Sequence, residues 1–267
     1  NSNVAIGYAA LAAETLGDRN VAIGVNALNA QNNTSDADVY NVAIGYEAGT
    51  LITTAVNNTL IGGLAGDALT TGSSNILLGY DAGGAITIGS DNVAIGNHAL
   101  NAETEHGRSV AIGHESLGAQ NAGAHAYNIG IGYSAGNDIT TGIKNTITGG
   151  LAGDAITDGN ENTAYGYSSL SGEDSGGSNT AIGAQALGTQ DGGSSNVAVG
   201  RQAGLNISTG DNNTVIGGNA GDALTTGDNN IIIGKDAAAS AVGVSNTTVI
   251  GTATTTNAIV HGLRTPL

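Results

Sequence analysis

A five-residue segment typified by Asn-Val-Ala-Ile-Gly returns throughout the chain, and its spacing limits the fold more than any other feature. With that Asn as position 1, the Gly at position 5 occurs fifteen times, and twelve of the fourteen intervals are 17 residues long. The other two intervals are 21 and 19 residues, and the next copy resumes in phase after each. The copies, numbered here as coils 1 to 15, begin at residues 3, 20, 41, 58, 75, 92, 109, 128, 145, 162, 179, 196, 213, 230 and 247. Fifteen coils therefore fill the chain, and the extra residues are loops.

Each coil has the features of β structure. A 17-residue period is too short for the helix pairs of α-solenoids, and the Gly and β-branched residues oppose helix. Positions 2 and 4 alternate around position 3, as Val42 and Ile44 do around Ala43, which is the period of a strand. Seventeen residues accommodate two short strands and two turns. The sequence thus predicts an all-β, parallel β-solenoid of about fifteen 17-residue coils, roughly 70 Å long at about 4.8 Å per rung.

Two columns of the repeat are predicted to be structural. The Gly at position 5 is never replaced, which indicates a left-handed backbone or a close approach of two backbones. Position 1 is Asn in thirteen coils, with Ser109 and Thr247 as the exceptions, and stacked Asn amides can hydrogen-bond from rung to rung. The residues that we assign to these roles include Asn41, Gly45, Asn58, Gly62, Asn92, Gly96, Asn179 and Gly183.

Both faces of the repeated strand are apolar. Position 3 lies opposite positions 2 and 4, on the face that we expect to point out of the coil, yet it is Ala, Gly, Val, Leu or Ile in every coil. A strand that is apolar on both faces needs a second packing partner. We expect this partner to be another copy of the chain, covering position 3 in a homo-oligomer. The alternative is a monomer whose second strand covers position 3.

Positions 3 and 9 vary together. Six coils have Leu at position 9, and all six have Ala at position 3. Eight coils have Gly or Ala at position 9, and five of those have Leu, Ile or Val at position 3. Bulk at one position therefore excludes bulk at the other, which predicts that the two side chains fill one space. The repeated NTLIGGLAGDALTTG of residues 58–72 is then a packing type that fills this space from position 3.

Composition excludes several classes of partner. With 22 acidic and 6 basic residues, the formal charge of −16 argues against binding to nucleic acid or to anionic membranes. No apolar run approaches the eighteen residues of a membrane span. The absence of Cys excludes disulfides and thiolate metal sites, and we expect no cofactor. The chain begins at Asn1, which we interpret as the start of an excerpt or a processed product.

The NVAIG and NTAIG segments, with Ala three residues after the Gly, resemble the head repeats of YadA-like trimeric adhesins and the related repeats of phage tail-fibre and bacterial surface-fibre proteins. The resemblance covers about residues 3–251. It implies a left-handed parallel β-roll in a homotrimer, extracellular on a virion or cell fibre, that holds a host-binding tip. The final TTTNAIVHGLRTPL resembles the exit segment before a C-terminal domain. We therefore divide the chain into a repeat domain, 1–251, and an exit segment, 252–267.

Candidate chemistry is sparse. Asp67, Asp154 and Asp222 recur at position 10 of distant coils, so they suit turns better than a catalytic pair, and no dense calcium-binding motif accompanies them. The sequence thus predicts a non-enzymatic fibre or adhesin segment. The alternative is a monomeric solenoid that binds glycan, calcium or ice along its side.

Histidine and tyrosine supply the remaining candidates. His98 and His114 lie in adjacent coils, and strand alternation is expected to point them in different directions rather than toward a shared metal. Five Tyr residues at position 6 are expected to pack on neighbouring rungs. Tyr40 and Tyr127 end the two insertions and are our candidates for contact with a host-surface glycan or receptor, because exposed Tyr can stack on sugar rings.

Overall fold

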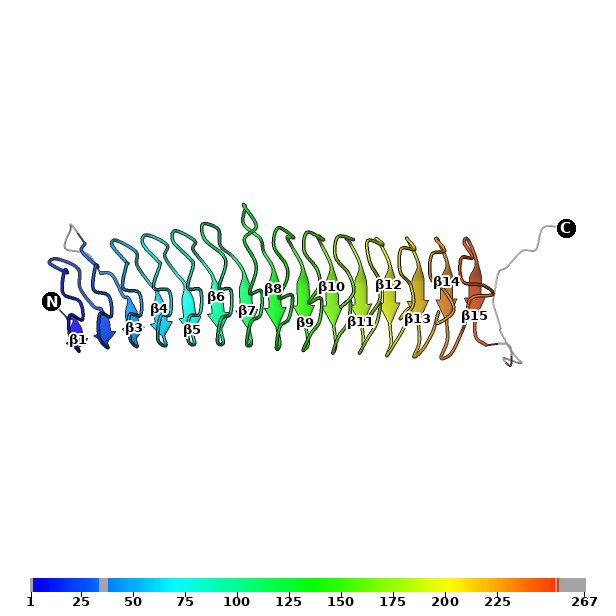
Figure 1. Cartoon of the computed structure of the whole chain (residues 1–267), viewed down its shortest axis with the longest axis horizontal. Coiled ribbons are helices and arrows are strands. Elements are labelled where there is room, and N and C mark those ends of the chain that lie inside the picture. Colours follow the sequence, from blue (N-terminus) through cyan, green and yellow to red (C-terminus); the bar gives the residue numbers. More distant parts are fainter. Residues whose placement is uncertain (1, 34–37, 253, 255–267) are drawn as a thin grey trace.

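The computed structural model describes residues 2–33, 38–252 and 254, and these form one long β-solenoid (Figure 1). Fifteen parallel strands follow one another in chain order within a single sheet. Their bounds are β1 Val4–Ile6, β2 Val21–Ile23, β3 Val42–Ile44, β4 Thr59–Ile61, β5 Ile76–Leu78, β6 Val93–Ile95, β7 Val110–Ile112, β8 Ile129–Ile131, β9 Thr146–Thr148, β10 Thr163–Tyr165, β11 Thr180–Ile182, β12 Val197–Val199, β13 Thr214–Ile216, β14 Ile231–Ile233 and β15 Thr248–Ile250. The predicted all-β class, parallel arrangement and 17-residue coil are confirmed.

Each coil contains less β-strand than expected. Among the described residues every coil has one three-residue strand, and the prediction of two strands per coil was wrong. The rest of the coil is turn, held by backbone hydrogen bonds to the next rung, such as Asn26 N to Tyr8 O at 2.9 Å. Positions 7 and 17 have positive φ in coil after coil, as in Glu47 at 55° and Asn57 at 61°. Left-handed corners bend the chain too sharply for a second strand to extend.

Position 3 points into the coil, so our assignment of the strand faces was wrong. From β2 to β14 the middle residue of every strand is buried, whereas positions 2 and 4 are half-buried or exposed. The alternation was recognised correctly, but a period of two does not say which face is inside. The interior is narrow and takes a single strand side chain per rung. The wider pair at positions 2 and 4 therefore faces outward.

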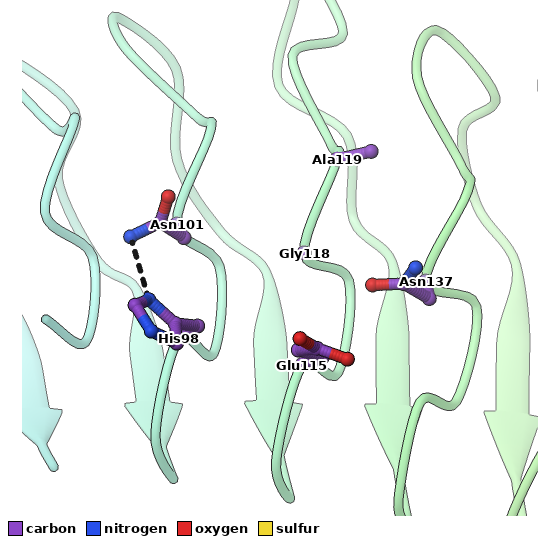
Figure 2. A pocket seen from close by; sticks show the side chains of 6 residues that line it. All are labelled: His98, Asn101, Glu115, Gly118, Ala119 and Asn137. Atoms are coloured by element: carbon purple, nitrogen blue, oxygen red, sulfur yellow. Dashed lines mark hydrogen bonds between the residues drawn. The ribbon is translucent and has the colours of Figure 1, made fainter. Parts of the chain in front are cut away.

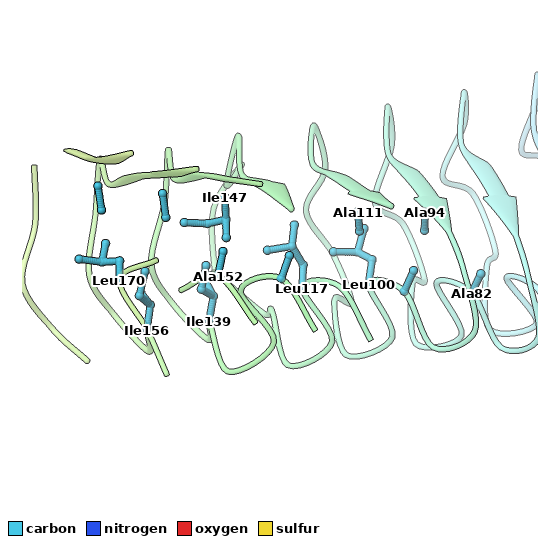
Figure 3. Close-up of a cluster of buried hydrophobic side chains, with 14 of the residues drawn as sticks. Ala82, Ala94, Leu100, Ala111, Leu117, Ile139, Ile147, Ala152, Ile156 and Leu170 are labelled. Atoms are coloured by element: carbon cyan, nitrogen blue, oxygen red, sulfur yellow. The ribbon is translucent and has the colours of Figure 1, made fainter. Parts of the chain in front are cut away.

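The core is a column of side chains from positions 3, 8, 9 and 12 that runs along the rod. Figure 3 shows its middle part, between Ala82 and Leu170. The predicted sharing of space between positions 3 and 9 is confirmed by the glycines. A Cβ on Gly66, at position 9, would lie 2.8 Å from Cδ1 of Leu77 and 3.3 Å from Cδ2 of Leu60, both at position 3. A Cβ on Gly130, at position 3, would lie 2.8 Å from Cγ of Leu117, at position 9. Side chains at positions 3 and 9 therefore compete for the same part of the column.

This packing predicts a compensating pair of substitutions in coil 6. Ala94→Leu should overpack the column and cost roughly 1 to 3 kcal/mol. Leu100→Gly should leave a cavity, although its cost is reduced because Leu100 has a φ of 51° that Gly adopts without strain. We expect the double variant to be more stable than the sum of the two losses, as measured by a double-mutant cycle on reversible thermal unfolding. Ala94→Leu combined with the distant Leu187→Gly is the control and should be additive. Additivity in the coil 6 pair would contradict the shared space.

The position 5 glycines combine a positive φ with backbone contact. Gly45, Gly62 and Gly96 have φ of 144°, 140° and 140°. A Cβ on any of them would collide with the carbonyl group of the position 5 glycine in the next coil. This contact explains the strictness of the column, because no side chain fits between the rungs.

The position 1 asparagines form a ladder inside the coil. The backbone N–H of Asn58 donates to Oδ1 of Asn41 at 2.9 Å, and its Nδ2 donates to the carbonyl of Gly72 at 3.0 Å. The same pattern recurs at Asn92 and Asn179. Each amide thus ties its own coil closed and binds the next coil, which satisfies buried polar groups that would otherwise be costly.

Most of the predicted exit segment, 252–267, lies outside the described residues, as do residues 34–37 of the first insertion. Thr252 and Thr254 are described, and their hydroxyl oxygens lie 3.0 Å apart. In the part of the chain that the structure describes, no helix has the length and apolarity needed to cross a membrane.

Candidate functional site

The outward side chains of the sheet make an uncharged strip along the whole rod. We call positions 2 and 4 of the fifteen strands the outer strip. No coil has a charged residue at either position, although the chain carries 28 charged residues besides His. The strip exposes large side chains in many coils, including Ile61 at 38%, Ile76 at 41%, Ile131 at 38%, Ile182 at 39%, Ile216 at 38% and Ile231 at 42%. Thr occupies position 2 in six coils and both positions in coil 9, so the strip is uncharged throughout and apolar over most of its length. A long exposed surface of this kind is typical of an interaction site.

The tyrosines at position 6 border this strip. Their exposed fractions run from 52% for Tyr80 to 79% for Tyr8, and some of them also contact the neighbouring rung, as Tyr80 does His98 with ring centres 5.6 Å apart. Tyr80 lies beside Gly63 of the preceding coil, where an added Cβ would come within 3.6 Å of the ring. The tyrosine rings therefore widen the apolar surface instead of joining the core.

Tyr40 and Tyr127 are the last residues of the two lengthened coils, and they take the place that position 17 has in the other coils, at the corner before the next Asn. Both rings are 49% exposed. An arginine from the same corner of the preceding coil lies over each ring. The guanidinium carbon of Arg19 is 5.5 Å from the Tyr40 ring centre, and that of Arg108 is 5.7 Å from the Tyr127 ring centre. The sequence indicated the tyrosines, but the arginines beside them were missed.

The two histidines of adjacent coils make separate contacts. Nδ1 of His98 lies 3.1 Å from Oδ2 of Asp81, and His114 stacks on Tyr133 with ring centres 5.4 Å apart. His98 lines a shallow pocket of ≈ 380 Å³ with Asn101, Glu115, Gly118, Ala119 and Asn137 (Figure 2). Among the described residues no group of three or more His, Asp or Glu side chains is placed to hold a metal ion.

The position 10 aspartates lie in separate coils, as their spacing predicted. Burial and the charges of Asp81 and Glu47 raise the pKa of Asp67, partly offset by hydrogen bonds from backbone N–H groups. Burial, with a smaller contribution from the charge of Asp138, raises the pKa of Asp154. Neither aspartate has the other within reach as an acid–base partner, because five coils separate them.

Three Glu–Gln pairs were missed by the sequence analysis. In each pair a Glu at position 12 accepts a hydrogen bond from a Gln 17 residues later, at 2.8 Å for Glu14–Gln31, 3.1 Å for Glu103–Gln120 and 2.8 Å for Glu173–Gln190. The Gln oxygen in turn accepts from an Asn of the ladder, as Gln31 does from Asn41 at 2.9 Å. All six residues lie in coils with Leu at position 9, whereas seven coils with Gly at position 9 have Ile or Leu at position 12. The joint occurrence of Leu at position 9 and Glu or Gln at position 12 was the sequence signal that could have predicted these pairs.

Glu14 predicts a pH dependence. Burial raises its pKa, but hydrogen bonds from Asn33, Gln31 and the Gly17 N–H outweigh burial and lower the pKa from 4.5 to about 2. A carboxyl group whose pKa is lower in the folded state than in the unfolded state stabilises the fold at pH values above its unfolded-state pKa. That stabilisation is lost as the pH falls toward the folded-state pKa. The melting-temperature gap between wild type and Glu14→Gln should therefore shrink between about pH 5 and pH 2. Glu105→Gln, at an exposed site, is the control. A gap that is constant with pH would contradict the assignment.

Comparisons of the chain with protein-family models, with curated proteins and with solved structures gave no match. The outer strip, the position 17 corners and the Glu–Gln pairs are therefore interpreted from their own chemistry.

Proposed function

We propose that this chain is a structural, non-enzymatic segment of a homotrimeric fibre, in which three copies face one another through their outer strips. The observation that carries the proposal is the strip itself. It is partly exposed, mostly apolar and free of charge over fifteen coils, in a chain with a formal charge of −16. Like charges elsewhere on the surface oppose random association of copies, whereas the strip is the surface on which copies meet without bringing charges together.

The dimensions of the strip support self-association. A strip of roughly 70 Å by about 10 Å offers about 700 Å² on each copy, so three copies that face one another bury about 2,100 Å² in total, which is enough for a stable assembly. A partner must be uncharged and mostly apolar over the same length, and a second copy of this chain meets that requirement. Closed rotational symmetry uses the same surface on every copy and leaves no strip uncovered.

The number of copies and the biological setting come from the resemblance to adhesin heads and tail fibres. That resemblance supports three chains and an extracellular fibre that displays a binding tip. A monomeric solenoid that binds glycan, calcium or ice along its side is the alternative. It leaves the strip in water along the whole rod, which the exposed Ile and Tyr side chains disfavour.

One pair of variants in coil 8 tests this function. Ile131 lies in the outer strip and is 38% exposed, so a lysine there reaches water in a single chain but is buried in the assembly. Ile131→Lys should reduce the particle mass toward that of one chain, because buried unpaired charges cost several kcal/mol. Thr141→Lys adds the same charge to an exposed position of the same coil, outside the strip, and should leave the mass unchanged. Equal effects of the two variants would contradict the interface.

A further inference from the structure

The two position 17 tyrosines belong to clusters that recur along the rod. In coils 1 and 2, and again in coils 6 and 7, the first coil ends in Arg and the second in Tyr. Nη1 of Arg19 donates to the hydroxyl of Tyr40 at 3.3 Å, and Nη1 of Arg108 donates to that of Tyr127 at 2.7 Å. The same pair of residue types thus makes the same contact twice, which packing of the core does not require.

Each cluster also contains a carboxylate. Arg19 forms an ion pair with Asp38, to which the Tyr40 hydroxyl also donates at 3.3 Å. Nε of Arg108 lies 3.8 Å from Oδ2 of Asp91. All these side chains project from the surface of the rod, with side-chain exposures of 47% for Arg19 and 46% for Arg108. A half-exposed ring, a guanidinium fork and a carboxylate therefore stand together at both places.

We propose that these two Arg–Tyr clusters are binding sites for a neutral saccharide. The Tyr ring offers an apolar surface on which the C–H face of a pyranose stacks. The guanidinium supplies N–H donors and the carboxylate supplies acceptors, which together match neighbouring sugar hydroxyls that both donate and accept. Holding Arg and Asp against each other before binding reduces the ordering cost when the ligand arrives.

The charges favour a neutral ligand over an ionic one. Each cluster combines one cationic and one anionic side chain, so its own charges cancel. An anionic glycan is repelled by the field of a chain with a formal charge of −16. A cationic ligand would have to displace the guanidinium from its carboxylate.

The clusters are placed to act together. Tyr40 and Tyr127 occupy the same corner five coils apart, which corresponds to about 24 Å at ~4.8 Å per rung. A linear polysaccharide that spans this distance engages both clusters, and the second contact then adds to the apparent affinity without a new type of site.

The clusters can be removed without disturbing the corner. Asn occupies position 17 with positive φ at Asn57, Asn212, Asn229 and Asn246, so Tyr40→Asn and Tyr127→Asn keep the backbone geometry. The probe is affinity electrophoresis in native gels that contain dextran, mannan or galactan, with polygalacturonate as the anionic comparison. We expect at least one neutral polysaccharide to retard the wild type. The double Asn variant should lose this retardation, and each single variant should weaken binding by about a hundredfold or more. Glu161→Ala, at the same corner of coil 9, should leave the retardation unchanged.

A gain of binding provides the complementary test. Coils 10 and 11 share the Leu and Glu–Gln pattern but have Ser178 and Ser195 at position 17. Ser178→Arg with Ser195→Tyr should build a third cluster and increase the retardation. The proposal is overturned if none of the three neutral polysaccharides retards the wild type, if the double Asn variant is retarded as strongly, or if polygalacturonate retards the wild type at least as well. None of these outcomes depends on the number of chains in the fibre.

Discussion

Gly183→Ala is expected to lower the free energy of unfolding by roughly 3 kcal/mol or more. Gly183 has a φ of 130°, and an added Cβ would lie 2.5 Å from the carbonyl oxygen of Gly200 and 3.0 Å from N of Arg201. Both atoms belong to the backbone of the next coil. That coil is fixed by the in-register pairing of β11 with β12, so relief requires separating two rungs.

Gly218→Ala is the matched control for this substitution. Gly218 lies at position 6, where other coils carry a side chain, and an added Cβ has its nearest neighbour at 3.9 Å. We expect its melting temperature to stay close to that of the wild type, while Gly183→Ala melts many degrees lower. Similar melting temperatures for the two variants would mean that contact between rungs does not explain the glycine column.

Gln190→Glu is expected to cost roughly 3 to 5 kcal/mol at neutral pH. Glu173 and Gln190 are both fully buried, and Oε1 of Glu173 also accepts from the N–H groups of Gly176 at 2.5 Å and Gly192 at 2.9 Å. The substitution places a second carboxylate where Nε2 of Gln190 donated at 2.8 Å. Two like charges then share a site without solvent.

The pH dependence of this variant distinguishes charge repulsion from a packing defect. Two carboxylates in one site hold a shared proton to a higher pH than an isolated carboxyl group does. Stability is therefore lost as pH rises through that raised pKa, and Gln190→Glu should recover part of its loss on acidification from pH 7 to about pH 5. Gln202→Glu, placed beside the neutral Gln185 near the surface, is the control and should show a small loss. A loss for Gln190→Glu that does not change with pH would indicate packing alone.

Much of the fold follows from the repeat. The fifteen position 5 glycines give the number of coils and their register, because each strand pairs with the equivalent residues one period later. The shared space of positions 3 and 9 was also predictable, since Leu117 and its counterparts always accompany a small residue. These features depend on local volume and phase, which a repeated sequence displays directly.

The orientation of the strand could not be predicted in the same way. Ala43 and its neighbours Val42 and Ile44 are all apolar, so hydrophobicity does not say which side is interior. The decision depends on the width of the coil, which is set by left-handed corners such as Glu47 and Asn57. Those corners have no fixed residue type. The Arg–Tyr contacts were missed for a different reason, because their two residues lie about one coil apart in sequence and meet only when two rungs stack.

The mass of the intact particle in solution tests most directly whether the outer strips face one another. Light scattering on the eluting particle gives this mass without assuming a shape, which matters for a rod. We expect about three times the 25.9 kDa of one chain, constant over a wide dilution range. A mass of 25.9 kDa at every concentration would show that the strip faces water, and it would contradict the proposed fibre.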